Sequence, residues 1–137
     1  MRSTLIDAGP LIALFDKDDK YHKTVVDFLS KITTALFTTW PVMTETCHML
    51  DFSVDAQLDF LEWASQGGLH IHDLGSADLE RMIALTRKYQ DRPMDLADAS
   101  LVVTSEKLGI RQIISIDRDF DIYRRADKKQ LENILLR

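Results

Sequence analysis

The stretch STLIDAGPLIALF, residues 3–15, decides the fold. Residues 3–7 have the apolar and β-branched character of a short strand, and Asp7 is its last residue. Gly9 and Pro10 then turn the chain, and proline suits the first turn of a helix. We therefore expect residues 11–15 to form a short apolar helix directly after the strand.

The same alternation of strand and helix continues along the chain. Further strands are expected at residues 35–39, 69–72 and 112–117, and helices at residues 22–32, 41–50, 54–65, 77–89 and 95–108. The tail, residues 131–136, fits either a strand or a last helical turn. Strands that alternate with helices predict an α/β fold with a mostly parallel sheet of four or five strands. Because no linker or repeat interrupts the pattern, residues 1–137 are expected to form a single domain.

Composition narrows the class of protein. The 137 residues are 45% apolar, which is enough for one compact core. The 22 acids outnumber the 17 bases, and the net charge of −5 argues against binding of duplexes through a broad basic face. It does not exclude a nuclease with an acidic, metal-dependent site. Cys47 is the only cysteine, so no intramolecular disulfide can form.

The sequence gives no sign of a membrane protein. Its apolar runs are shorter than the roughly 18 residues that a membrane-spanning helix needs. Asp7 also interrupts any signal-peptide core. We therefore expect a cytoplasmic protein with no membrane partner.

Four acids occupy positions where such folds place active sites. Ligands of α/β sheets bind beyond the carboxyl ends of the strands. Asp7 and Asp117 end the first and fourth expected strands, so both should project from one sheet edge. Glu45 follows the second strand on a helix, where Val42 and Met49 place it on the apolar side. The alternative for Glu45 is a partly exposed helix acid.

Asp95 and Asp98 begin the last long helix. Asp95 is best interpreted as its N-cap, with direct metal binding as the alternative. Asp98 lies one turn further, and the helix N-terminus would stabilise its charge. Leu101 and Val102 place Asp98 on the apolar side as well.

Four clustered carboxylates have a strong physical consequence. Two of them about 5 Å apart repel each other by roughly 3 kcal/mol at an effective dielectric near 20. Together they need protonation or a cation, and Mg²⁺ prefers such oxygen ligands. A site of this kind can hydrolyse phosphodiesters by activating water.

Two other groups of residues are candidates for function. A basic stretch near the C-terminus is either a solvated surface or a patch that contacts a nucleic-acid backbone; it comprises Arg118, Arg124, Arg125, Lys128 and Lys129. His70 and His72 alternate along one strand and could bind a transition metal, but no third ligand lies nearby in the sequence.

Two other enzyme and signalling classes also place acids at strand ends. A haloacid-dehalogenase-type phosphatase needs a second aspartate at position 9, where this chain has Gly9. A receiver domain needs an acidic pair after the first strand and a lysine in a late one, and both are missing here. Both classes are therefore disfavoured.

Four motifs together resemble the PIN-domain ribonucleases, in particular the VapC-type toxins of bacterial toxin–antitoxin pairs. The opening stretch, residues 5–15, is similar to the family's first motif. Thr44-Glu45 matches the helix that carries the family's glutamate, and residues 98–102 resemble the helix with its third acid. Residues 115–120 resemble the closing Thr-x-Asp-x-x-Phe element, with Ser115 in place of threonine.

The resemblance implies a PIN-like, three-layer α/β/α fold and a Mg²⁺- or Mn²⁺-dependent endoribonuclease with one or two ions per site. Its acidic site would consist of Asp7, Glu45, Asp98 and Asp117, with the metal held mainly by Asp98 and Asp7 and with help from Asp117. Ser115 would support the site, and Asp95 and Asp119 would be auxiliary acids.

The resemblance also implies partners. These are an RNA substrate, a second copy of the chain in a homodimer, and a small cognate antitoxin, through which alone operator DNA would be bound. Two alternatives remain: a PIN nuclease that processes RNA outside toxin pairs, and a non-catalytic PIN module that only binds.

Overall fold

The computed structural model describes residues 2–92 and 94–137, and its centre is a five-stranded sheet. The strands are β1 (Ser3–Ile6), β2 (Ala35–Thr39), β3 (His70–His72), β4 (Gln112–Ile114) and β5 (Glu132–Asn133). They are ordered β3-β2-β1-β4-β5, and every neighbouring pair is parallel. The sheet predicted from the sequence is thereby confirmed, and the tail, which the sequence left undecided, contributes its fifth strand.

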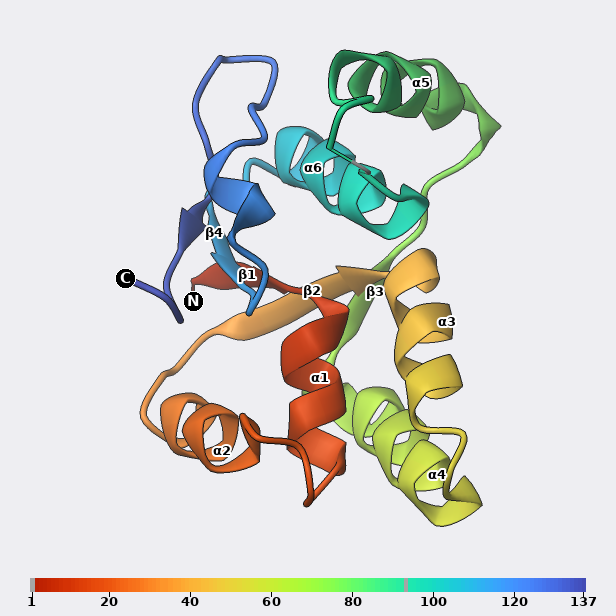
Figure 1. Cartoon of the computed structure of the whole chain (residues 1–137), viewed down its shortest axis with the longest axis vertical. Coiled ribbons are helices and arrows are strands. Elements are labelled where there is room, and N and C mark those ends of the chain that lie inside the picture. Colours follow the sequence, from red (N-terminus) through yellow and green to blue (C-terminus); the bar gives the residue numbers. More distant parts are fainter. Residues whose placement is uncertain (1, 93) are drawn as a thin grey trace.

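Helices cover both faces of this sheet. Figure 1 shows α1 (Ala8–Phe15), α2 (His22–Ser30), α3 (Trp40–Met49) and α4 (Val54–Trp63) below it, and α5 (Leu79–Lys88) and α6 (Leu96–Leu108) above it. Short helical turns connect some of these elements, namely η1 (Ala64–Gly68), η2 (Ser76–Asp78) and η3 (Arg118–Asp121). The arrangement is a three-layer α/β/α fold, as expected.

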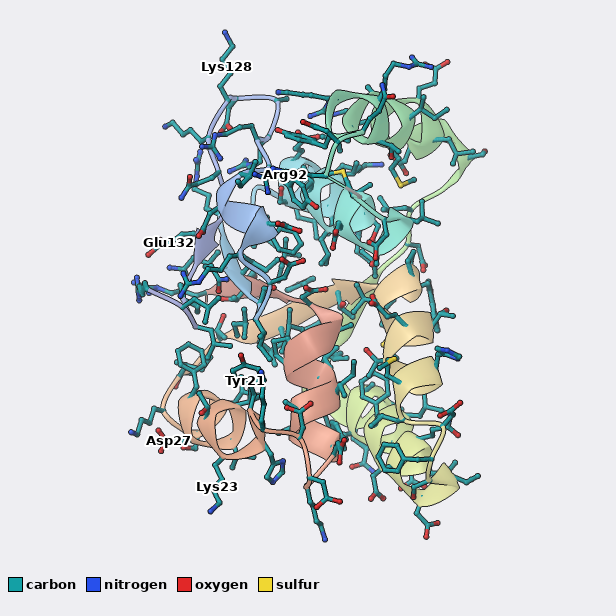
Figure 2. The ribbon with its side chains drawn as sticks, in the orientation of Figure 1. Tyr21, Lys23, Asp27, Arg92, Lys128 and Glu132 are labelled. Atoms are coloured by element: carbon teal, nitrogen blue, oxygen red, sulfur yellow. The ribbon has the colours of Figure 1, made fainter. Side chains whose placement is uncertain are left out.

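The buried core lies on both sides of β1 and β4. Leu5, Ile6, Ile113 and Ile114 are fully buried in these central strands. Helix α6 is buried along most of its length, from Ala97 to Ser105, because it lies between the sheet and α5. Charged side chains surround this core, and Lys23, Asp27, Lys128 and Glu132 extend from its periphery in Figure 2.

Two predicted element boundaries need correction. Asp7 follows β1 and caps α1, with its Oδ1 accepting a hydrogen bond from the Ala8 amide at 2.8 Å. Asp117 lies three residues beyond β4 and caps η3, with its Oδ1 accepting from the Asp119 amide at 2.9 Å. Both acids therefore lie just beyond the carboxyl ends of their strands and not within them. Their side-chain directions are set by the caps and not by the alternating pattern of a strand.

None of the helices in the described part of the chain is long and apolar enough to cross a bilayer.

Candidate active site

An acidic cavity lies at the carboxyl edge of the sheet, where β1 and β4 run side by side. Its volume is about 410 Å³. Six carboxylates line it, together with apolar residues of α1 and α3; they are those of Asp7, Glu45, Asp95, Asp98, Asp117 and Asp119. The structure thus brings together the four principal acids and both auxiliary acids that the sequence singled out.

Ser115 links the two acids that follow the central strands. Its Oγ donates a hydrogen bond to Asp7 Oδ2 at 3.0 Å and accepts one from the Asp117 amide at 2.9 Å. The serine is fully buried. Because β1 and β4 are hydrogen-bonded neighbours, this single hydroxyl fixes Asp7 against the segment that carries Asp117.

Asp95 and Asp98 enter the cavity from the first turn of α6. Asp95 caps this helix, and its Oδ1 accepts a hydrogen bond from the Asp98 amide at 2.8 Å. The predicted N-cap is therefore confirmed. Asp98 itself is buried, as its apolar neighbours indicated. Its Oδ2 accepts a hydrogen bond from the Tyr123 hydroxyl at 3.2 Å.

Glu45 lies on an exposed face of α3 and not on the core-facing side. The apolar stripe of Val42 and Met49 suggested a core-facing glutamate, but Glu45 is exposed and Met49 is about half exposed. Only Val42, Met43 and Thr46 are buried on this helix. Glu45 and Met49 border the cavity and not the core. The alternative for Glu45, an exposed helix acid, is therefore the correct one, and the residue lines the site from that exposed face.

The electrostatics of the cavity oppose full ionisation. Burial, together with the charges of Asp7, Asp95 and Asp117, raises the pKa of Asp98 to about 8. Burial raises the pKa of Asp7 to about 6, although hydrogen bonds from the Ala8 amide and Ser115 act in the opposite direction. The pKa values of Glu45 and Asp117 are also raised, first by lost hydration and then by neighbouring acids.

These carboxylates fit a hard divalent cation in their chemistry, since oxygen donors with destabilised negative charge are what Mg²⁺ and Mn²⁺ prefer. Within residues 2–92 and 94–137, however, no three histidine, cysteine, aspartate or glutamate side chains already converge on a point that could hold an ion. The carboxylates surround the cavity without converging on one point. A cation would have to draw Asp7, Asp98 and Asp117 together.

The predicted basic stretch lies outside this cavity. Arg124 Nη1 donates to the backbone carbonyls of Asp121, Ile122 and Tyr123. The Arg125 side chain is nine-tenths buried, and its Nη1 lies 3.7 Å from Asp127 Oδ2. Arg118, Lys128 and Lys129 are exposed, and Lys128 lies at the tip of a loop (Figure 2). Arg124 and Arg125 therefore make contacts within the chain, whereas the other three basic side chains are accessible to a ligand.

Two residues near the acids were missed by the sequence analysis. Arg92 Nη1 lies 3.6 Å from Asp119 Oδ1, and the arginine side chain is 47% exposed. The buried Tyr123 hydroxyl donates a hydrogen bond to Asp98. Neither lies in a recognisable motif, because each meets the site through tertiary contacts with an acid distant in the sequence.

The histidine pair has a different environment from the acids. The His70 ring stacks on Phe37 with the ring centroids 4.9 Å apart. His72 lines a separate pocket of about 250 Å³ at the carboxyl ends of β2 and β3. The structure provides no third ligand for the pair among the described residues.

Comparison with known proteins agrees with this fold. No family model matches the chain. The chain is 29% identical over 116 residues to Ribonuclease VapC26 of Mycobacterium tuberculosis, which covers 83% of this chain and 86% of the relative. Its fold matches the crystal structure of Mycobacterium tuberculosis VapC20, a "Sarcin-Ricin loop cleaving toxin", with a TM-score of 0.79 and 17% identity over 87% of this chain and 93% of the other.

The fold and the acidic edge thus define a PIN-like α/β domain. The similarity to a VapC ribonuclease, together with the shared fold of a VapC toxin, confirms the resemblance to the VapC-type PIN ribonucleases that the four motifs indicated.

Proposed function

We propose that this chain is a metal-dependent endoribonuclease and the toxin of a VapBC-like toxin–antitoxin pair. The observation that carries the proposal is the gathering of Asp7, Glu45, Asp98 and Asp117 around one cavity at the carboxyl edge of the sheet. The chain's similarity to a protein named as a VapC ribonuclease supports RNA as the substrate. The presence of all four acids disfavours the non-catalytic binding module.

Each acid has a role that its surroundings support. Asp7, Asp98 and Asp117 would hold one or two Mg²⁺ or Mn²⁺ ions, because they are the acids fixed by Ser115, by Tyr123 and by the η3 cap. A bound ion would supply positive charge to the phosphodiester and to the attacking water. Asp95 and Asp119 add negative charge at the rim.

Glu45 is the general base in this proposal. It lines the cavity and is exposed, so solvent reaches it, and its raised pKa makes it a better proton acceptor. As Glu45 takes the proton, the water oxygen bonds to phosphorus and the bond from phosphorus to the 3′ oxygen breaks. The leaving 3′ oxygen takes a proton from solvent water, so the products carry a 3′-hydroxyl and a 5′-phosphate, and Glu45 later returns its proton to solvent.

The direct test is cleavage of RNA by the purified chain. We expect cleavage with Mg²⁺ or Mn²⁺ and its loss when EDTA removes the metal, measured on a gel with end-labelled RNA. Expression of the chain in a bacterial host should arrest growth, and co-expression of the small protein encoded beside it should restore growth. RNA cleavage without growth arrest would favour the alternative, a PIN nuclease in RNA processing.

Arg92 is a cation beside the cavity that could meet the RNA backbone, because it pairs with the cavity acid Asp119. Its link to Asp119 places a half-exposed guanidinium on the rim. Arg92→Ala is expected to raise the KM for RNA roughly three- to tenfold with little change in kcat, since a rim charge acts mainly on encounter. The salt dependence of KM should also weaken.

Lys128→Ala is the matched comparison for Arg92, because Lys128 belongs to the basic stretch and lies at a distant loop tip. If Lys128→Ala raises KM and Arg92→Ala does not, the backbone passes over the basic stretch and not over the rim. Steady-state kinetics on one RNA substrate at two salt concentrations separates the two cases.

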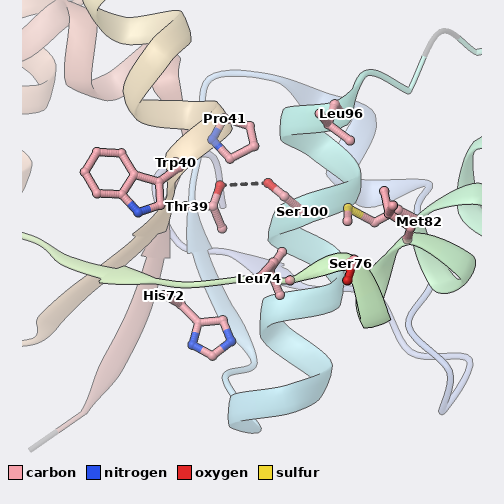
Figure 3. A pocket seen from close by; sticks show the side chains of 11 residues that line it. Thr39, Trp40, Pro41, His72, Leu74, Ser76, Met82, Leu96 and Ser100 are labelled. Atoms are coloured by element: carbon pink, nitrogen blue, oxygen red, sulfur yellow. Dashed lines mark hydrogen bonds between the residues drawn. The ribbon is translucent and has the colours of Figure 1, made fainter.

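A homodimer is the assembly that we propose, with a second copy covering an apolar strip beside the site. This strip consists of Trp40, Leu79, Ile83 and Leu96, each about half exposed. Trp40, Leu79 and Leu96 surround the pocket shown in Figure 3, where the Thr39 and Ser100 hydroxyls are hydrogen-bonded at 2.7 Å. Contiguous exposed apolar side chains of this kind mark protein interfaces.

The strip also adjoins the acidic cavity. Trp40 and Leu96 line the same hollow as Glu45 and Asp95, so a second copy seated there would form part of the RNA entrance. Light scattering of the purified chain measures the mass directly. The VapC resemblance also implies an antitoxin as a partner. We propose that it relieves toxicity by blocking this entrance. Both proteins would be cytoplasmic.

A further inference from the structure

Tyr123 is a buried aromatic residue whose hydroxyl contacts the acidic site. Only 2% of its surface is exposed. Its ring packs edge-on against Phe120 and Tyr89, with centroid separations of 5.4 Å and 5.1 Å. The hydroxyl donates to Asp98 Oδ2 at 3.2 Å. The ring belongs to the core, while its one polar group is directed at a carboxylate of the cavity.

A neighbouring tyrosine shows that burial alone does not require this arrangement. The Tyr89 hydroxyl, in the same aromatic cluster, accepts a hydrogen bond from the Arg124 backbone amide at 2.8 Å. A buried phenol can therefore be satisfied here by the backbone, as most buried polar groups are. Tyr123 instead donates to Asp98, a buried acid of the cavity whose pKa is raised first by burial and then by the neighbouring acids.

The bond also connects two acids that lie on different elements. The Tyr123 amide donates to the Asp119 carbonyl at 3.1 Å, and the Asp119 amide donates to Asp117 Oδ1 at 2.9 Å. Through its hydroxyl, Tyr123 then reaches Asp98 on α6. A short chain of hydrogen bonds thus runs from Asp117 to Asp98, although the two residues belong to separate segments.

We infer that Tyr123 is a positioning residue, which orients the Asp98 carboxylate at the cavity and ties it to the segment of Asp117, so that both acids can close on one divalent ion. The inference rests on the proposed metal-dependent function and adds a residue to it. Groups that hydrogen-bond metal ligands orient them, and their loss commonly weakens metal binding about 10- to 100-fold. Tyr123 is such a group for Asp98, because its hydroxyl donates to Asp98 Oδ2.

The test compares Tyr123→Phe with Tyr89→Phe, because each removes one buried hydroxyl from the same aromatic cluster and keeps the ring. Binding of Mg²⁺ alone to the metal-free chain is measured by calorimetry, and Mn²⁺ binding by electron paramagnetic resonance. We expect Tyr123→Phe to weaken binding about tenfold or more. Tyr89→Phe should stay within about twofold of the unmodified chain. Melting temperatures without metal report on the fold of each variant.

A further variant separates positioning from stability. Incorporation of 3-fluorotyrosine at position 123 keeps the ring and the hydroxyl donor, so it should retain the affinity of the unmodified chain even where Tyr123→Phe unfolds. Equal metal affinity in Tyr123→Phe and the unmodified chain overturns the inference, as does equal weakening in both phenylalanine variants. A chain that binds no Mg²⁺ or Mn²⁺ overturns it too.

The failure of this inference and that of the proposed function are distinguishable. If Tyr123→Phe loses metal affinity but the unmodified chain cuts no RNA, the positioning role stands and the ribonuclease proposal is wrong. If the chain cuts RNA with Mg²⁺ and Tyr123→Phe binds the metal normally, the function stands and Tyr123 has only a packing role.

Discussion

Replacement of Asp7 with asparagine is expected to reduce RNA cleavage by about a hundredfold or more, the scale of losing one preorganised electrostatic group. Asparagine keeps the size of the side chain, and its one oxygen can still accept from the Ala8 amide. Its NH2 group then faces Ser115, whose hydroxyl oxygen can accept a hydrogen bond there in place of donating one. It removes the negative charge that Asp7 contributes to the cavity. The loss should therefore appear in kcat and in metal affinity, while the fold remains.

The control for Asp7→Asn is Asp59→Asn, because Asp59 is an exposed acid on α4 and does not line the cavity. Single-turnover cleavage of end-labelled RNA in saturating Mg²⁺ compares the two variants. Unchanged cleavage by Asp7→Asn would show that the acidic cavity is not the site of catalysis. A fall of the same size in both variants would point to contamination or to general loss of folding.

Replacement of Asp98 with asparagine is expected to stabilise the metal-free protein at neutral pH. The folded pKa of about 8 lies well above the value near 3.9 of an unfolded aspartate. Between these two values the folded chain holds a proton that the unfolded chain has released, so stability falls as pH rises from about 4 to 8. Below about pH 4 both states are protonated, and the penalty disappears.

The expected size of this effect follows from about 1.4 kcal/mol for each pKa unit. At pH 7 Asp98→Asn should gain roughly 2–4 kcal/mol in the free energy of unfolding, with a rise of several degrees in melting temperature. The gain should shrink toward pH 4, because asparagine does not titrate. Thermal unfolding in EDTA at pH 4, 5.5, 7 and 8 measures this profile.

Mg²⁺ should reverse the order of the melting temperatures, so that the unmodified chain becomes more stable than Asp98→Asn. A cation that binds the folded state stabilises the unmodified chain, whereas Asp98→Asn has lost a carboxylate ligand and should respond weakly. Asp59→Asn again serves as control and should follow the unmodified chain at each pH. If Asp98→Asn melts at a lower temperature than the unmodified chain in EDTA at pH 7, the Asp98 carboxylate stabilises the fold. The raised pKa of Asp98 would then be wrong.

Most of the fold could be predicted from the sequence, because strand and helix periodicities are local. The four expected strands and the long helices lie where the patterns placed them, within a few residues. The fifth strand, β5, could not be assigned because two residues, Glu132 and Asn133, carry no periodicity. It forms only because β4 offers a free edge beside it.

The candidate site was partly predictable for a similar reason. Asp7 and Asp117 could be placed from the strands that precede them, and Asp95 from its position before a helix. The apolar stripe of α3 predicts a core-facing Glu45, but in the structure Met49 of that stripe is exposed. Whether a helical face meets the core or a cavity depends on what packs against it.

By itself, the sequence determined the alternation of elements, the parallel sheet and the acids at the strand and helix ends, since each follows from residue type and local spacing. Only the tertiary structure decided how those acids are held. The strand order sets β4 beside β1, which places Ser115 against Asp7. The segment after β4 then brings Tyr123 to Asp98 and Asp119 to Arg92. These contacts join residues from 25 to 108 positions apart, and no local pattern encodes them, because they arise from packing of the whole chain around one sheet.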